Sequence, residues 1–168
     1  MPQIKIREWN EKPRTKLRFI KIGDIFCYQF SEEMFVFGQI LGKVNVGHVI
    51  QFFDFFQASP TITVEELSRA QFIGKPIIVD SYTLFDRNPV WSWQIIGHQV
   101  DFDPSPFKDL AFKWGDPNGL HFGKVWLDGR REPKIFSREE VEDLDWEACV
   151  GSIVYNRILE EELDKQMK

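Results

Sequence analysis

WSWQIIGHQV, from Trp91 to Val100, is the stretch that best indicates the fold. Large apolar side chains recur at every second position from Trp91 through Trp93 to Ile95, which is the periodicity of a β-strand. Residues 101–107 follow with an Asp-Pro pair and a second proline, and such residues start turns and extended loops. We therefore expect a core strand that runs into a surface loop.

Four further apolar runs are separated by short stretches rich in turn residues. They are Lys21–Phe30, Met34–Leu41, His48–Phe56 and Ile77–Phe85. Strands joined by such short connections pair in an antiparallel meander. Sixteen phenylalanines in 168 residues suit a sheet, because aromatic side chains pack well on a pleated surface. A mainly antiparallel, twisted β-sheet is expected.

Helical signals are fewer. Thr63 and Glu66 form a capping box, in which a hydroxyl residue is followed three positions later by Glu, and the helix behind it should end near Gly74. Two helices are expected in residues 137–168. One follows a second capping box at Ser137–Glu140, and the other carries an apolar stripe with a four-residue spacing. The stripe consists of Tyr155, Leu159, Leu163 and Met167.

The predicted fold class is therefore α+β, with one short helix after the first strands and C-terminal helices packed on or beside the sheet. Residues 1–17 are expected to form an arm or an edge strand. No repeat, low-complexity segment or linker divides the chain, so residues 1–168 are expected to form a single domain.

Charge and cysteine content limit the class of protein. The net charge is −5, and residues 132–168 carry five basic and eleven acidic side chains, which disfavours general binding of nucleic acid. No apolar run approaches the roughly 20 residues of a membrane span, and no signal peptide is recognised. Cys27 and Cys149 lie outside any C-x-x-C spacing and are expected to be free thiols in a reducing compartment, the cytoplasm.

His98, Asp101 and Asp103 raise the question of a metal site, because imidazole and carboxylate groups are common ligands. A small metal-dependent hydrolase is one alternative. In the other alternative, the three residues are structural: His98 projects from a strand on the same side as Ile96 and Val100, and the two aspartates begin the turn that follows. No further histidine is recruited by spacing, and we expect no metal and no cofactor.

Two further features could bind a partner. Trp114 and Asp116 lie in the turn-rich stretch KWGDPNG, and Trp126 lies a little further along. Exposed tryptophans are frequent at binding hot spots, so the protein could be a carbohydrate- or peptide-binding module. In the alternative interpretation, the tryptophans fold back over the edge of the core and have a structural role. The second feature is a run of carboxylates that could steer a basic partner. It includes Glu139, Glu140, Glu142 and Asp143.

Four motifs in order resemble the immunity protein 26 family of bacterial polymorphic toxin systems. They are Gly23-Asp24-Ile25-Phe26, then Phe35-Val36-Phe37-Gly38-Gln39-Ile40, then Trp93-Gln94-Ile95-Ile96-Gly97, then Pro104-Ser105-Pro106-Phe107. The resemblance covers about Arg18 to Phe122. The residues before it and the acidic residues after Arg131 fall outside.

The resemblance implies a mainly β protein without catalytic residues. It implies an immunity protein that binds a cognate toxin domain and neutralises it by occlusion. Such toxins are often basic nucleases, against which an acidic inhibitor can mimic phosphate. Glu139, Glu140, Glu142 and Asp143, with Trp114 and Asp116, are the expected partner-binding residues. A monomer or weak dimer is expected.

Overall fold

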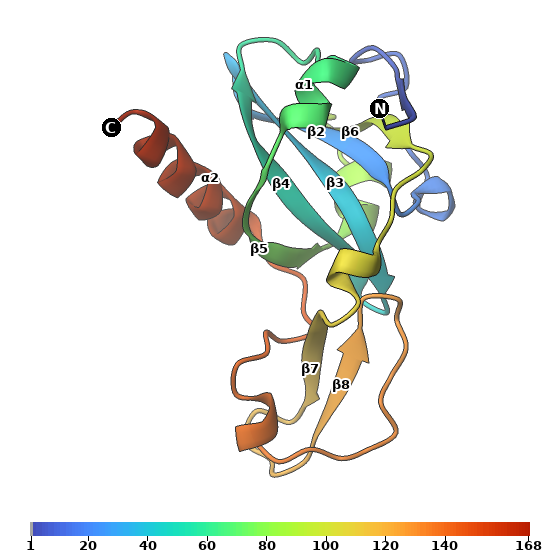
Figure 1. Ribbon diagram of the computed structural model, residues 1–168, viewed down its shortest axis with the longest axis vertical. Coiled ribbons are helices and arrows are strands. Elements are labelled where there is room, and N and C mark those ends of the chain that lie inside the picture. Colours follow the sequence, from blue (N-terminus) through green and yellow to red (C-terminus); the bar gives the residue numbers. More distant parts are fainter. Residues whose placement is uncertain (1) are drawn as a thin grey trace.

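A six-stranded antiparallel sheet forms the centre of the molecule in the computed structural model, which describes residues 2–168 (Figure 1). The strand order is β1-β6-β2-β3-β4-β5. The strands are β1 (Ile4–Ile6), β2 (Asp24–Ser31), β3 (Met34–Val44), β4 (Gly47–Gln57), β5 (Phe72–Val79) and β6 (Trp93–Gln99). The predicted α+β class with a mainly antiparallel sheet is confirmed.

Apolar side chains cover both faces of this sheet, which explains why β2 and β3 are almost continuously hydrophobic. On one face Trp93 lies at the centre of an aromatic cluster, 1 % exposed, and the short helical turns η1 (Leu17–Phe19) and η2 (Tyr82–Asp86) lie over it. On the other face, side chains from α1 (Val64–Arg69) and the N-terminal arm complete a second cluster. The sheet therefore leaves little of its own surface free for a site.

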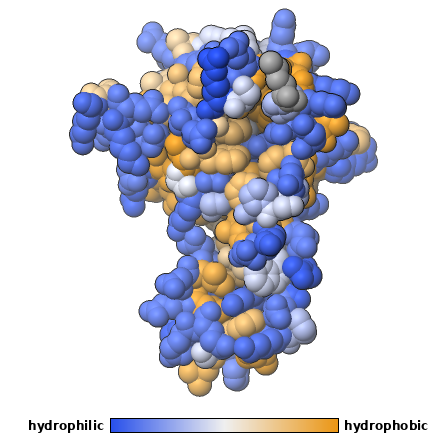
Figure 2. Space-filling view, viewed as in Figure 1, coloured by the Kyte–Doolittle hydropathy of each residue, from blue (hydrophilic) through white to orange (hydrophobic). Residues whose placement is uncertain are grey.

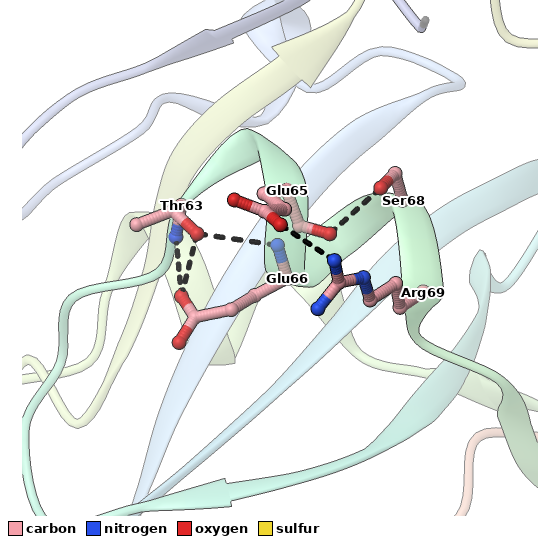
Figure 3. A network of polar contacts seen from close by, with 5 residues as sticks. All are labelled: Thr63, Glu65, Glu66, Ser68 and Arg69. Carbon is pink, nitrogen blue, oxygen red and sulfur yellow. Dashed lines mark hydrogen bonds and ion pairs between the residues drawn. The ribbon is translucent and has the colours of Figure 1, made fainter.

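Helix α1 begins as predicted, at a complete capping box (Figure 3). The backbone N–H of Glu66 donates to the Thr63 hydroxyl at 3.2 Å, and the N–H of Thr63 donates to the Glu66 carboxylate at 2.8 Å. The helix ends at Arg69 rather than near Gly74, because the chain joins the sheet as β5 from Phe72.

The predicted strand Ile77–Phe85 is correct only in its first part. Strand β5 ends at Val79, and residues 82–86 form a single π-helical turn that buries Phe85. Asp80 begins this turn, since its carboxylate accepts from the backbone N–H and the hydroxyl of Thr83. Local side-chain hydrogen bonds of this kind compete with a strand ladder.

A small two-stranded hairpin follows the central sheet and was not predicted as strands. It consists of β7 (Ala111–Gly115) and β8 (Phe122–Trp126), with KWGDPNG at its tip. Residues 110–149, named the hairpin lobe here, form the lower part of Figure 1. Phe112, Val125 and Leu127 join it to the end of the large sheet.

The expected helix after Ser137 is wrong, although its capping box forms. The Ser137 N–H donates to the Glu140 carboxylate at 2.7 Å, but only one 3-10 turn follows, η4 (Glu139–Val141). Beyond it the chain extends along β7, where the Lys113 N–H donates to the Asp145 carbonyl and the Glu147 N–H donates to the Lys113 carbonyl. Pairing with β7 replaces the local helix, an override that weak propensities permit.

The one C-terminal α-helix in residues 2–168 is α2 (Ser152–Gln166), which projects beside the sheet (Figure 1). Of the predicted stripe, Tyr155 and Leu159 are buried, Leu163 is half-buried and Met167 is exposed. The Tyr28 hydroxyl donates to the Asn156 amide oxygen at 3.1 Å and helps hold the first half of the helix. Among the helices described, none has the length and apolar character needed to cross a membrane.

Candidate partner-binding surface

Side chains pack on both faces of the β7–β8 hairpin. This packing determines which of the predicted partner-binding residues remain exposed. One face is covered by the returning chain, where Phe136 and Val141 pack against Phe122. On the other face Trp114 stands opposite Gly123 in the strand register. A Cβ at Gly123 would lie 2.1 Å from the indole, so only glycine allows the ring to lie across β8.

Trp114 is partly covered from a second direction. The Arg131 guanidinium lies 4.8 Å from the ring centroid, in cation–π contact. Arg131 is itself fixed by an ion pair of 2.7 Å with Glu147, whose side chain is buried. The indole is still 39 % exposed. Trp114 therefore packs over the hairpin and keeps an exposed edge.

Trp126 is half-buried, and Arg130 lies 5.8 Å from its ring centroid. It stands opposite Ala111 in the β7–β8 register, while Trp114 stands opposite Gly123. Residues that alternate along an antiparallel pair this way project from opposite faces. The two tryptophans therefore do not form one platform of the kind a carbohydrate module uses.

Asp116 shapes the tip of the hairpin. Its carboxylate accepts from the Asn118 N–H at 2.9 Å, which closes the turn. Arg138, from the segment before η4, donates to the carbonyls of Pro117 and Gly119 at 2.9 and 3.1 Å. These two bonds hold the start of the acidic segment, residues 139–147, against the tip. The predicted acidic residues and the Trp114–Asp116 stretch thus belong to one lobe.

The carboxylates of the acidic segment fall into two groups. Some are neutralised: Glu140 pairs with Lys134 at 2.9 Å, Asp145 with Lys75 at 2.6 Å, and Glu147 with Arg131. The others, Glu139, Glu142 and Asp143, are exposed and have no ion pair within residues 2–168.

Hydrogen bonds keep the carboxylates of η4 in their charged form. The backbone N–H of Ser137, together with the Lys134 ammonium, lowers the pKa of Glu140. A backbone hydrogen bond and the Ser137 hydroxyl lower the pKa of Glu139. The Lys113 ammonium donates to the carbonyls of Val141 and Glu142 and forms no ion pair with the carboxylates of η4 within residues 2–168.

Two apolar residues at the end of the lobe were missed by the sequence analysis. Leu120 is 78 % exposed in the hairpin turn, and Ile135 is 65 % exposed just before Phe136. Figure 2 shows hydrophobic surface at this end among hydrophilic side chains. Each residue is a single apolar position in a polar stretch, so no periodic pattern marks it.

The residues of the alternative metal-site interpretation, His98, Asp101 and Asp103, do not converge. The His98 Nδ1 lies 2.9 Å from the Asp24 carboxylate, Asp101 accepts from the Gln3 N–H, and Asp103 accepts from the Ser105 N–H. Across residues 2–168, no three His, Cys, Asp or Glu side chains are grouped as a metal would require. Asp103 starts a turn, as the structural alternative predicted.

The side-chain direction expected for His98 was wrong. Between the pairs Ile25–Gly97 and Phe26–Ile95, strand β6 contains one residue more than β2. This β-bulge shifts the alternation by one position, so that His98 and Ile95 line the same cavity.

Sequence comparison connects the chain with a known protein family. No curated protein and no solved structure matches the chain. The model of the family described as Immunity protein 26 matches residues 21–121, from the turn just before β2 to the turn before β8. This is more than half of the chain, and it contains all four motifs noted in the sequence. The chain therefore belongs to the immunity protein 26 family.

Proposed function

We propose that this protein binds a cognate toxin domain and neutralises it by covering its active site or an essential surface, without chemistry of its own. Membership of an immunity protein family implies the toxin-neutralising role. Occlusion is consistent with the positions of the candidate reactive side chains: His98 pairs with Asp24, and Asp101 and Asp103 accept from the backbone N–H groups of Gln3 and Ser105.

The end of the hairpin lobe is the proposed binding surface. One observation supports this placement. Glu139, Glu142 and Asp143 are exposed, form no ion pair within residues 2–168, and lie next to the turn that presents Leu120. Ile135 lies four residues before Glu139 in the chain. Interfaces combine apolar anchors, which supply affinity, with charges that steer the approach. Unpaired carboxylates beside exposed apolar side chains provide both.

The partner that fits this surface is basic. Glu140 lies at its edge, where its charge is paired with that of Lys134, and the protein as a whole carries −5. Asp116 continues the surface at the hairpin tip, and Trp114, on the opposite face of the hairpin, offers a further rigid contact to a partner that wraps around the tip. A basic nuclease domain has the required charge. We place this action in the cytoplasm, which is supported by the free thiols of Cys27 and Cys149.

A charge-reversal experiment tests the placement. The toxin domain encoded beside the gene is the partner, and association rates are measured by stopped flow at several salt concentrations. The triple variant Glu139→Lys, Glu142→Lys and Asp143→Lys should associate roughly ten-fold more slowly at low salt, with a weaker dependence on salt, because steering is lost.

The matched control is the triple variant Glu160→Lys, Glu161→Lys and Asp164→Lys on α2. These carboxylates are also exposed and unpaired within residues 2–168, so the change in net charge is the same and only its position differs. An equal loss of rate in both triple variants, or no loss in either, would contradict the proposed surface.

The apolar part of the surface is tested separately. Leu120→Ser and Ile135→Ser remove exposed side chains that pack against little of the protein, so stability should be nearly unchanged. Dissociation of the complex should become faster, since apolar anchors act mainly on the dissociation rate. Val90→Ser is the control, because Val90 is 75 % exposed and lies outside the lobe.

A further inference from the structure

A concave site, separate from the proposed binding surface, lies where the N-terminal arm crosses the large sheet, away from the hairpin lobe. It encloses about 320 Å³. Three cationic side chains line it, namely Arg7, Lys12 and Lys21, together with Thr15, Phe19 and His98. Seven of the first 21 residues are basic and two are acidic, so this end of the chain has the opposite charge to residues 132–168.

The fold brings these residues together from distant positions. The Arg7 N–H donates to the Ile96 carbonyl and so continues the β1–β6 pairing. The Thr15 N–H donates to the Phe85 carbonyl, which holds the arm against η2. The β-bulge in β6 then turns His98 toward the arm. The cavity is therefore made of well-anchored backbone rather than of loose chain.

The cations of this cavity are free to bind an anion. Arg7, Lys12 and Lys21 have no carboxylate oxygen within 4.0 Å anywhere in residues 2–168. Asp24 is the one carboxylate in the lining, and both its oxygens are occupied, one by His98 and the other by the Lys21 N–H at 2.7 Å. The lining thus has an excess of positive charge.

Thr15 supplies an independent indication of a ligand. The residue is only 4 % exposed, and its hydroxyl has no hydrogen-bond partner within residues 2–168. A buried polar group without a partner is rare and costs on the order of 1–3 kcal/mol. The O–H is a donor that a ligand oxygen can satisfy, and it belongs to a residue of the cationic lining.

Phe19 adds an aromatic surface at the rim of the cavity. Its ring is 49 % exposed. The Arg18 guanidinium and the Lys12 ammonium lie 4.9 and 5.8 Å from the ring centroid. Because Phe19 is half exposed and lies beside these cations, a planar base or other apolar group can contact its ring while an attached anion reaches the cations.

We propose that this cavity binds a phosphate monoester of nucleotide size. Three cations and a hydroxyl donor suit the several oxygens and double charge of a phosphate better than a single planar carboxylate. The volume is at the lower end of that of small-molecule sites, and the aromatic rim favours a nucleoside over inorganic phosphate. The proposal does not depend on toxin binding.

Isothermal titration calorimetry at constant ionic strength tests it, with adenosine monophosphate, inorganic phosphate and glutarate as the probes. Saturable binding of adenosine monophosphate is expected, with weaker binding of phosphate and none of glutarate. Arg7→Gln and Lys21→Gln should each weaken binding at least ten-fold. Lys16→Gln removes an exposed charge of the same arm that does not line the cavity, and it should bind like the wild type.

Thr15→Val separates binding from folding. Because the hydroxyl has no partner in the protein, its replacement by a methyl group should preserve or raise the melting temperature and still weaken nucleotide binding. No saturable binding of the phosphate probes would overturn the proposal. Binding of glutarate as tight as that of the nucleotide, or equal losses in Lys16→Gln and Arg7→Gln, would overturn it as well.

Discussion

Acid stability should depend on one buried imidazole. His48 lies on β4, is 1 % exposed, and its Nδ1 is 2.6 Å from the Ser81 hydroxyl oxygen. Burial lowers the pKa of His48 from 6.5 to about 4, and the charge of Lys43, its cross-strand neighbour, acts in the same direction. The ring is therefore neutral in the folded protein at neutral pH.

The direction of the pH effect follows from this lowered pKa. Between pH 6.5 and about 4, the unfolded chain binds a proton at His48 that the folded protein does not, so the free energy of unfolding decreases as the pH falls through this window. The whole decrease amounts to roughly 3 kcal/mol, at about 1.4 kcal/mol for each ten-fold difference in proton affinity. Below the folded pKa this contribution becomes flat.

Urea unfolding measured at pH 7, 6, 5 and 4 gives the test. His48→Asn keeps a polar atom near the position of Nδ1 but cannot take up a proton. Between pH 7 and 4, the free energy of unfolding of this variant should fall by up to roughly 3 kcal/mol less than that of the wild type. His121→Asn removes an exposed imidazole instead and should follow the wild-type profile. Parallel profiles for the wild type and His48→Asn would show that His48 does not have a lowered pKa in the folded protein.

Three further perturbations test the packing. Leu159→Ala should cost about 2–5 kcal/mol, because the side chain is fully buried and few others anchor α2; a smaller loss in urea unfolding would mean that α2 is not docked as described. Gly38→Ala would place a Cβ 2.4 Å from the Phe26 ring, and a melting temperature equal to that of the wild type would contradict this close packing. A thiol reagent should label Cys149 in the folded protein and Cys27 only after unfolding, since Cys149 is exposed whereas burial raises the pKa of Cys27 and removes it from solvent; equal labelling rates in the folded protein would be inconsistent with that burial.

The sheet was predictable from the sequence because its strands are marked by strong local signals. Strands β2, β3 and β4 are long apolar runs ended by glycines or polar turns, and they appear where expected. The β7–β8 hairpin was not predictable in this way. Its strands are five residues each, and Trp114 is packed by Gly123 and Arg131, contacts that become visible only in three dimensions.

The candidate surface shows the same division between local and long-range information. The sequence identifies the carboxylates of residues 139–147, but Asp145 is paired with Lys75 from β5, 70 residues earlier. Such partners decide which charges remain free, and no local pattern contains them. Likewise, the bulge in β6 that redirects His98 depends on the register with β2.

Titration of the toxin domain's activity by this protein tests the central claim most directly. The toxin domain encoded beside the gene is held at a fixed concentration, and its residual activity is measured as the protein is added. Residual activity should fall linearly to zero at a fixed, small-integer ratio of the two proteins, with the protein recovered unchanged. Full toxin activity in the presence of excess folded protein would contradict the proposed immunity function.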